Sequence, residues 1–570
     1  MRRQTFVRMY GKAVGEYHRK MTQTRAVALC FPPHWYYAAL PADLVYTGAF
    51  LRARGVEVMA LDLSAGALHG KLKSVLGFHA LRQRETYSSK TALTDATEQV
   101  ERALSMVSQR YGCEYSFSSL SFPGKAVERV PIARQVGLSL SKNPTLPVLQ
   151  QAVSALLRSD PVVVAVALVH PDQMVPTLAL GRLLRSAGYR GFLCVYGAHE
   201  DVLSPEDLLD DVLPVSGEPL HLFFEDFDGV IVGEAETALF SLWTALSENR
   251  PLADVPSLLA PKHGLVSVEK RGRENLRALA RPDFSFADPA LYPYPEPIVD
   301  VRMSRGCPWN RCAFCAITLH QEGYRALPVA EVAQDLVTAH AQLGTSFFRF
   351  RDDLLTPKQL LALARTATEL PFPIRFSVRS RFEPELTLDV LLRAAQAGLS
   401  ELWLGLESAV PRVRNLMQKG AEQDVVLRIL SDAHTAGIRV RALCLLGFPG
   451  ETPAERQATI DFLDEHQGLL SSCALTPFLP MKRSPIGKHP SAFSVTPLPD
   501  AVPRHERLRQ TFPATWPLAP TQAELEETLH HATERLGRRF LQECVGPTLL
   551  HAMIHHSVTQ NGWPQAPEKG

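Results

Sequence analysis

Between residues 298 and 478, short apolar runs alternate with segments whose apolar residues recur at helical spacing. Such runs, bounded by polar turns, predict buried strands, here at 298–303, 346–350, 374–378, 401–405, 438–445 and 473–478. Helical patterns lie between them at about 328–343, 356–369, 387–397, 422–436 and 453–466. Alternating strands and helices predict a parallel sheet, and six strands are too few for a closed eight-stranded barrel. We therefore expect an open, partial barrel.

The front of the chain repeats this rhythm more loosely. Apolar runs at 26–31, 56–61, 162–169 and 192–196 are separated by helical patterns at about 41–54 and 172–187. A further run, from Asp228 to Glu236, leads into another helix. Buried strands alternating with helices predict a doubly wound, Rossmann-like sheet, with ligand space beyond the carboxyl ends of the strands.

These patterns divide the chain of 570 residues into an α/β domain at 1–250, a proline-rich linker at 251–297, the barrel at 298–478 and a C-terminal region at 479–570. The first domain contains an insertion at about 65–160, which we expect to form a lid or helical cap. The C-terminal region is predicted to be small and mainly helical, with helices at about 521–537 and 540–556. His551 and His555 share one face of the second helix, where a packed or solvated histidine pair is favoured over a metal site.

Composition excludes some functions. The net charge is +1, with 60 basic and 59 acidic residues, so no overall charge attracts the chain to nucleic acid. The longest apolar run has eight residues, which is too short for a membrane span. The basic N-terminus lacks the apolar stretch of a signal peptide, so we expect neither segment. We expect a cytoplasmic protein whose scattered cysteines are buried free thiols: Cys30, Cys113, Cys194, Cys444, Cys473 and Cys544.

Three further cysteines, Cys307, Cys312 and Cys315, follow the first barrel strand at C-x4-C-x2-C spacing. A short loop allows three thiolates to converge on an iron–sulfur cluster, and a cubane bound by three cysteines leaves one iron open to a substrate or cofactor. A zinc site with His320 as the fourth ligand is the alternative. The flanking Gly-Cys-Pro and Cys-x-Phe-Cys context favours the cluster.

Several motifs follow the barrel strands at their carboxyl ends: Arg351-Asp352-Asp353, Arg379, Gly405-Leu-Glu407-Ser408 and Gly447-Phe-Pro-Gly-Glu451-Thr452. With the three cysteines, these motifs resemble the radical S-adenosylmethionine (SAM) superfamily over about 298–478. The resemblance implies a partial (β/α)6 TIM barrel. The commonest superfamily spacing is C-x3-C-x2-C, and this chain has one residue more between the first two cysteines.

The resemblance also implies cofactors and their ligands. Cys307, Cys312 and Cys315 would hold a 4Fe-4S cluster whose open iron binds SAM, and one electron would cleave SAM to a 5′-deoxyadenosyl radical. The residues matching the family's SAM contacts are Asp352 and Asp353 for the amino group, Arg379 for the carboxylate, Glu407 and Ser408 for the ribose and methionine, and Phe314 for adenine. Strand-end salt bridges are the alternative role for the charged residues among them.

The N-terminal domain is similar to the cobalamin-binding domains that precede many radical SAM cores. This similarity rests on Pro32-Pro33 and on Asp228-Gly-Val-Ile-Val-Gly-Glu-Ala-Glu236. The expected pocket residues are Gly197, Ala198, Gly233 and Glu234, because small residues at strand ends admit a flat macrocycle. The chain lacks the Asp-x-His-x-x-Gly motif that supplies a lower cobalt ligand. Cobalamin-dependent radical SAM enzymes generally lack this motif as well. His170 and His199 lie near the predicted pocket, where a surface histidine is favoured over a cobalt ligand.

The resemblance implies an enzyme that transfers a methyl group to an unactivated carbon of a small-molecule or peptide substrate. An external donor such as flavodoxin or ferredoxin would supply the electron. Two alternatives stay open: a rearrangement or cyclisation enzyme with structural or absent cobalamin, and a non-catalytic redox or sensory protein. The spacing of Cys30, Cys113 and Cys194 does not match the second cluster that methylthiotransferases of this superfamily require.

Overall fold

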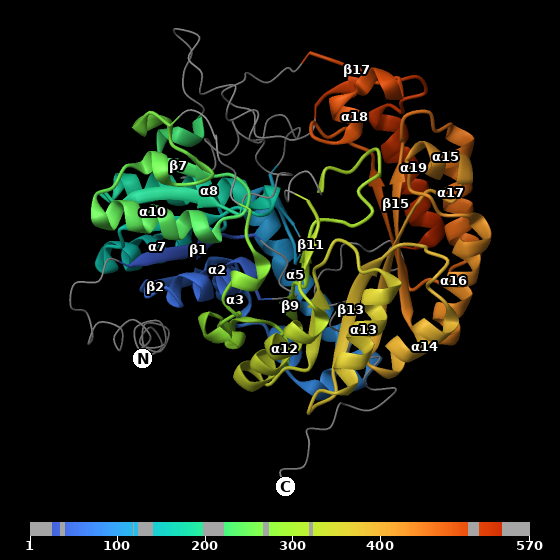
Figure 1. Ribbon diagram of the computed structural model, residues 1–570, viewed down its shortest axis with the longest axis horizontal. Helices are drawn as coiled ribbons and strands as arrows, with labels where there is room; N and C mark the ends of the chain where they lie inside the picture. Colours follow the sequence, from blue (N-terminus) through green and yellow to red (C-terminus); the bar gives the residue numbers. More distant parts are fainter. Residues whose placement is uncertain are drawn as a thin grey trace.

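The computed structural model describes residues 26–34, 40–117, 119–122, 139, 141–197, 222–265, 273–317, 323–499 and 512–537. Two six-stranded sheets lie side by side, each accompanied by helices (Figure 1). The first is built from the N-terminal part of the chain and the second from residues after 298. The chain is therefore α/β, as its hydrophobic pattern predicts.

The first sheet has the order β2-β1-β5-β6-β7-β8. Its strands are β1 (Val27–Phe31), β2 (Val58–Asp62), β5 (Val163–Ala167), β6 (Phe192–Tyr196), β7 (Gly229–Ile231) and β8 (Leu258–Leu259). All pairs are parallel except β7 with β8, which is antiparallel. The edge strand β8 lies within the stretch expected to be a linker. The order reverses between β1 and β5, and doubly wound sheets bind ligands at such a switch point.

Helices cover both faces of this sheet. One face packs against α3 (Leu63–Leu72), α7 (Leu146–Ser159) and α8 (Met174–Ser186), and the other against α2 (Ala42–Arg52) and α10 (Glu236–Glu248). The predicted insertion at 65–160 is therefore too long, because α3 and most of α7 fall inside it and belong to these helical layers. The segment that lies outside the layers is shorter. It contains α4 (Leu76–Ala80), α5 (Lys90–Tyr111) and the hairpin of β3 (Glu114–Tyr115) and β4 (Leu120–Ser121), which share a small core of their own.

The second sheet is entirely parallel and has the order β16-β15-β14-β13-β12-β9. Its strands are β9 (Val299–Val301), β12 (Phe347–Phe350), β13 (Arg375–Ser380), β14 (Leu399–Glu407), β15 (Arg439–Leu446) and β16 (Ser472–Pro477). Each coincides with a predicted strand to within a few residues. The sheet is curved and unclosed, so the partial barrel is confirmed (Figure 1).

Helices follow the strands of the second sheet and lie along its outer side (Figure 1). They are α12 (Val329–Leu343), α13 (Pro357–Thr368), α14 (Leu388–Gln396), α16 (Gln423–Thr435) and α17 (Pro453–Glu465). Both predicted capping boxes form, with Thr356 and Gln359 at α13 and with Thr452 and Glu455 at α17. The apolar residues facing these helices form the largest core of the protein, so the opposite, concave side is left for polar chemistry.

The C-terminal region contributes α19 (Gln522–Leu536), which packs on α17. Arg535 on α19 donates to Asp464 at 2.7 Å. The predicted helix at 540–556, with Cys544, His551 and His555, lies outside the described residues. No helix in the described part of the chain combines the length and apolar character needed to cross a membrane.

Candidate active site

The three cysteines lie on the loop that leaves the first strand of the barrel. After β9, the chain forms β10 (Ser304–Arg305), which pairs with β11 (Arg325–Ala326), and then turns at Gly306. Gly306 has φ of +83°, and a Cβ there would lie 2.9 Å from the carbonyl oxygen of Gly323. Only glycine fits this turn, and it directs the next residue, Cys307, away from the hairpin.

The three thiols are close enough to influence one another. Burial, together with the nearby Cys312 and Cys307, raises the pKa of Cys315 to about 12. The backbone N–H of Cys315 donates to the carbonyl of Cys312 at 3.2 Å. No three His, Cys, Asp or Glu side chains among the described residues converge as ligands of a single metal ion. A cubane needs a wider arrangement, because each thiolate binds a different iron, so three neighbouring thiols fit it better than a zinc ion. His320 lies outside the described residues.

An aromatic and cationic contact fixes the same loop. The guanidinium of Arg381 lies 3.4 Å from the ring centroid of Trp309, and the indole N–H donates to the carbonyl of Gln418 at 3.1 Å. Arg381 also donates to the carbonyl of Gly420 at 3.1 Å. Trp309 lies between the first two cysteines, where this chain has one residue more than the common spacing. Neither Trp309 nor Arg381 has a role that the sequence motifs predict.

Asp352 and Asp353 follow β12 and have different surroundings. Asp352 is buried and accepts hydrogen bonds from the Met303 N–H at 3.2 Å and from the Ser304 hydroxyl. Burial raises the pKa of its carboxyl to about 6, although these hydrogen bonds oppose the shift. Asp352 thus ties β12 to the start of the cysteine loop. Asp353 lies near enough to Cys315 for its charge to raise the pKa of that thiol.

Glu407 ends β14 in a strained conformation beside the cysteines. It has φ of +60°, and the pairing of β14 with β15 shifts between Gly405 and Glu407. Its carboxylate accepts from the ammonium of Lys419 at 2.7 Å, and the Lys419 charge lowers the pKa of Cys312 against the raising effect of burial. Lys419 was not predicted, because it lies twelve residues beyond Glu407 in a loop without a local signal.

Two other predicted SAM contacts lie near this loop. The Ser408 hydroxyl is buried, lies 3.2 Å from the hydroxyl of Thr459 and accepts from the Val410 N–H at 3.2 Å. Phe314 packs against a small core that includes Ala313 and Met417. The backbone N–H of Ala313 donates to the carbonyl of Met417 at 2.9 Å, so the cysteine loop is anchored to the segment between β14 and α16.

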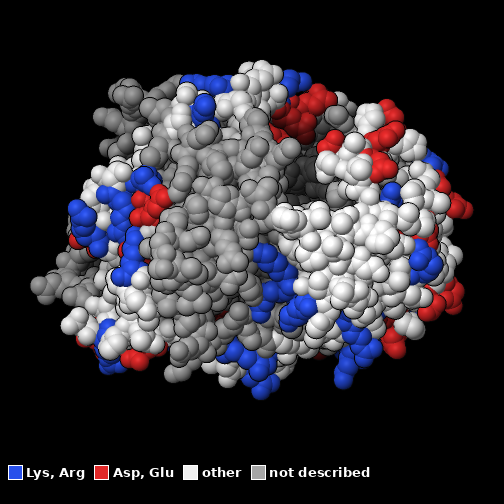
Figure 2. All heavy atoms as spheres, turned by 90° about the horizontal axis from the view of Figure 1, so that it is seen from above, with Lys and Arg blue, Asp and Glu red and all other residues white. Residues whose placement is uncertain are grey.

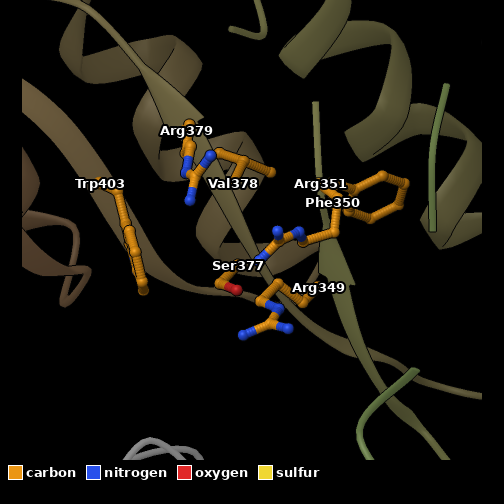
Figure 3. Close-up of a pocket in the computed structure, with 7 residues that line it drawn as sticks. All are labelled: Arg349, Phe350, Arg351, Ser377, Val378, Arg379 and Trp403. Atoms are coloured by element: carbon orange, nitrogen blue, oxygen red, sulfur yellow. The ribbon is translucent and has the colours of Figure 1, made fainter. Parts of the chain in front are cut away.

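Arg379 lies on the concave side of the sheet rather than alone at a strand end. It lines a hollow together with side chains from β12, β13 and β14. Figure 3 shows three guanidinium groups and the indole of Trp403 around one space, with the ring of Phe350 turned away from it; the guanidinium groups belong to Arg349, Arg351 and Arg379. The guanidinium of Arg379 lies 5.4 Å from the ring centroid of Trp403.

Glu451, in the loop after β15, is predicted to make the stability of the protein depend on pH. Its buried carboxyl accepts from the Gly447 N–H at 2.5 Å, and burial raises its pKa from 4.5 to about 7. The folded chain therefore holds a proton that the unfolded chain has lost, so stability falls as pH rises from 4.5 to about 7. Glu451→Gln, which imitates the neutral carboxyl, is expected to raise the free energy of unfolding by about 1–3 kcal/mol above that window.

Urea denaturation on either side of this pH window measures the effect. The variant and the wild type should differ little at the acidic end, where both carry a neutral group. Glu465→Gln, at an exposed position at the end of α17, is the control. Parallel stability curves for wild type and Glu451→Gln across the window would contradict the prediction.

The carboxyl edge of the first sheet carries the predicted cobalamin residues. Gly197 follows β6 with φ of +64°, and Gly233 follows β7 with φ of +85°. A Cβ added at Gly233 would meet nothing within 4 Å, so the space directly above this position is open. The Nδ1 of His170 accepts from the Asp172 N–H at 3.3 Å. Ala198 and His199 lie outside the described residues.

His34, which the sequence analysis did not identify, is buried just after β1 at the switch point. Burial lowers its pKa to about 3, so its ring is neutral at physiological pH. Gln173 joins the two strands of the switch point, accepting from the Val169 N–H at 2.8 Å and donating to the Pro32 carbonyl at 3.0 Å.

Glu234 joins this edge to the cysteine loop. Its carboxylate accepts from Arg325 at 3.0 Å and pairs with Arg305 at 3.3 Å. Arg305 also pairs with Glu236, the first residue of α10. All four side chains are largely buried, so the network is shielded from solvent. Since Arg305 precedes Cys307 by two residues, the carboxyl edge of the first sheet faces the site of the thiols.

Comparison with known proteins shows which proteins this chain is similar to. Residues 301–463 match the Radical SAM superfamily. An uncharacterized methyltransferase of Pyrococcus horikoshii is 26% identical over 282 residues, 47% of this chain and 61% of that protein. The ribosomal protein uS12 methylthiotransferase RimO of Azorhizobium caulinodans is 30% identical over 224 residues, 35% of this chain and 47% of RimO. This chain thus spans less than two thirds of the length of these relatives.

Two solved structures share the fold over most of the chain. The radical SAM methyltransferase TsrM of Kitasatospora setae, solved with cobalamin and a [4Fe-4S] cluster, has a TM-score of 0.55, covers 91% of this chain and 89% of its own, and is 15% identical. The cobalamin-dependent SAM radical enzyme OxsB, solved with aqua-cobalamin, has a TM-score of 0.56, covers 87% of this chain and 65% of its own, and is 12% identical.

Residues 301–463 carry a radical SAM domain, which spans most of the partial barrel and includes the cysteine loop. A Rossmann-like sheet precedes this domain in the chain.

Proposed function

We propose that this radical SAM enzyme holds a 4Fe-4S cluster on Cys307, Cys312 and Cys315, binds cobalamin at the carboxyl edge of the first sheet, and transfers a methyl group to carbon. One observation carries the proposal. Through Glu234 and Glu236, the carboxyl edge of the first sheet is bound to Arg305, at the start of the cysteine loop. A ligand of that edge and a cluster on that loop would share one space.

The residues around the thiols fit a SAM site. Asp353 provides a carboxylate near Cys315, which suits the amino group of SAM. Glu407 is held in a left-handed conformation beside Lys419, and strain of this kind is common at ligand sites. Asp352 acts on SAM indirectly, because it fixes Ser304 and thereby the path of the cysteine loop. When bound, the cofactors supply the electron that cleaves SAM to a 5′-deoxyadenosyl radical and the carrier that delivers the methyl group.

The concave side of the barrel is the proposed place of the substrate. It lies opposite the helix-covered core and opens beyond the same strand ends as the cysteine loop. The methyl acceptor is proposed to be a small molecule or a peptide, and an external flavodoxin or ferredoxin to be the electron donor.

Methylthio transfer is disfavoured by the positions of the N-terminal cysteines. Cys30 and Cys194 lie in the cores on opposite faces of the first sheet, and Cys113 lies in the separate core around α5. All three are buried. They do not converge on one loop, so they supply no second cluster site. The likeness to RimO is therefore taken as a likeness of the radical SAM domain.

A cobalamin-binding experiment tests the proposal against the rearrangement alternative. The anaerobically reconstituted protein is incubated with hydroxocobalamin, desalted and examined by ultraviolet–visible spectroscopy. We expect about one cobalamin per chain. Gly233→Phe, which fills the open space after β7, is expected to lower cobalamin affinity about tenfold or more by excluding the macrocycle.

Gly264→Phe is the matched control. Gly264 also has positive φ, +78° against +85° at Gly233, and open space around its Cα, but it follows β8 at the sheet's antiparallel edge. Both variants therefore bear the same backbone strain. If wild type retains no cobalamin, or if both phenylalanine variants lose it equally, the cobalamin site is not at this edge.

A further inference from the structure

Four arginines and one tryptophan form a row across the concave side of the barrel. Arg379 on β13 pairs in register with Trp403 on β14, and Trp403 pairs with Arg441 on β15. On the other side of Arg379, the row continues with Arg351, which follows β12, and with Arg302, which follows β9. These two follow the paired residues Arg349 and Asp300 by two positions, and the Arg351 N–H donates to the Val301 carbonyl at 2.8 Å.

Alternate residues of a strand face the same side of a sheet, so this row lies one level above another on the same face. We call the upper level the arginine row: Arg302, Arg351, Arg379, Trp403 and Arg441. The level beneath it consists of Asp300, Arg349, Ser377, Glu401 and Arg439.

The two levels together contain more cations than acids. Asp300 binds Arg349 through two hydrogen bonds and lies 3.8 Å from Arg351. The carboxylate of Glu401 accepts from the Trp403 N–H at 2.6 Å and lies near the charges of Arg441 and Arg439. A third acid, Asp43, lies 3.9 Å from Arg302. Six arginines therefore share these three acids, and the two levels carry net positive charge.

Burial makes this concentration of charge costly. The side chain of Arg351 is 24% exposed, and its burial, with the charge of neighbouring arginines, lowers its pKa to about 9. The Nε of Arg441 is buried and makes no hydrogen bond within the described structure. On the outer surface, in contrast, the face shown in Figure 2 carries both acidic and basic side chains. Grouped, half-buried guanidinium groups are typical of a site that receives an oxyanion.

We propose that the arginine row binds a carboxylate or phosphate group of the substrate, and that Trp403 contacts the part of the substrate beside it. This inference rests on the proposed function, which places the substrate on the concave side. SAM itself carries one carboxylate, for which Arg379 is the candidate, and Arg351 and Arg441 are the proposed ligands of a second anion. The guanidinium of Arg441 lies 4.7 Å from the ring centroid of Trp403, so anion and ring recognition occur together.

Anion binding to the SAM-loaded enzyme tests the proposal. The reconstituted protein is saturated with SAM, which fills its carboxylate site, and is titrated calorimetrically with succinate, with inorganic phosphate and with neutral succinamide. We expect saturable binding of one or both anions and none of succinamide. Arg351→Gln and Arg441→Gln are each expected to weaken anion binding about tenfold or more. Arg428→Gln removes an exposed arginine from α16 and is the matched control with unchanged binding.

Tighter succinate binding assigns the site to carboxylates, and tighter phosphate binding assigns it to phosphates. Two outcomes would overturn the proposal: neither anion binds once SAM is present, or Arg351→Gln and Arg441→Gln bind as wild type does. Thermal unfolding of each variant verifies that a loss of binding is not a loss of fold. Failure of the proposed function is seen separately, as absence of 5′-deoxyadenosine from the same preparation.

Discussion

Cys315→Ala is expected to abolish cluster assembly and, with it, SAM cleavage. Cys315 is the third thiol of the loop, and the influence of Cys312 and Cys307 on its pKa places all three in one group. A cubane held by two cysteines loses the iron that the third one fixed, so iron and sulfide content should fall to a small fraction of the wild-type value. Cleavage of SAM should fall by about a thousandfold or more, since the reaction requires the cluster.

Anaerobic reconstitution followed by iron analysis and ultraviolet–visible spectroscopy measures this effect. Cys312→Ala and Cys307→Ala are expected to behave like Cys315→Ala. Cys113→Ala is the control, because Cys113 is a buried thiol in the separate core around α5. A cluster of normal iron content in any of the three loop variants would show that the thiol concerned is not a ligand.

Asp300→Ala is expected to give the largest loss of stability in the barrel. Asp300 binds Arg349 in a two-pronged pair, with Oδ1 2.6 Å from Nε and Oδ2 2.9 Å from Nη2. Both side chains are only 6% exposed. Removing the carboxylate takes away the two-pronged partner of the buried Arg349, beside Arg351, a change that typically costs about 3–5 kcal/mol of unfolding free energy. Urea denaturation of wild type and variant measures this difference.

The double variant Asp300→Ala/Arg349→Met distinguishes a lost ion pair from a simple cavity. Replacing both charges removes the uncompensated guanidinium, so the double variant should recover much of the stability lost in Asp300→Ala. An effect of the double variant as large as the sum of the two single variants would contradict this explanation, since the charges would then act independently.

The elements of both sheets could be predicted because their strands are buried and their helices amphipathic. Each barrel strand is an apolar run, and Thr356 and Thr452 mark two helix starts by their capping boxes. The doubly wound class of the first sheet also follows from the alternation of its apolar runs with helical patterns, whereas its strand order required the structure. Its antiparallel edge strand β8 was missed, because Leu258–Leu259 is too short to give a periodic pattern.

The chemistry of the site was predicted only in part. The three cysteines are a local motif, so their proximity follows from their spacing. Lys419 pairs with Glu407, and Arg381 covers Trp309, across loops that only the folded barrel brings together. Asp352 is predicted to contact SAM, and the structure adds a hydrogen bond from the Ser304 hydroxyl to its carboxylate that the sequence did not indicate.

The arginine row could not be predicted from the sequence alone. Arg349 and Arg351 alternate with apolar residues in the sequence, as do Arg439 and Arg441. The alternation shows that they share one face of a strand, but not that this face is the concave one. The register of β13, β14 and β15 brings Arg379 and Arg441 to the same level on either side of Trp403.

SAM turnover by the reconstituted protein is the most direct test of the account. The anaerobic, reduced enzyme is incubated with SAM and its products are separated by liquid chromatography. The account predicts 5′-deoxyadenosine from the wild type and none from the enzyme that lacks the Cys315 thiol. A fully reconstituted wild type that binds iron but releases no 5′-deoxyadenosine would contradict it.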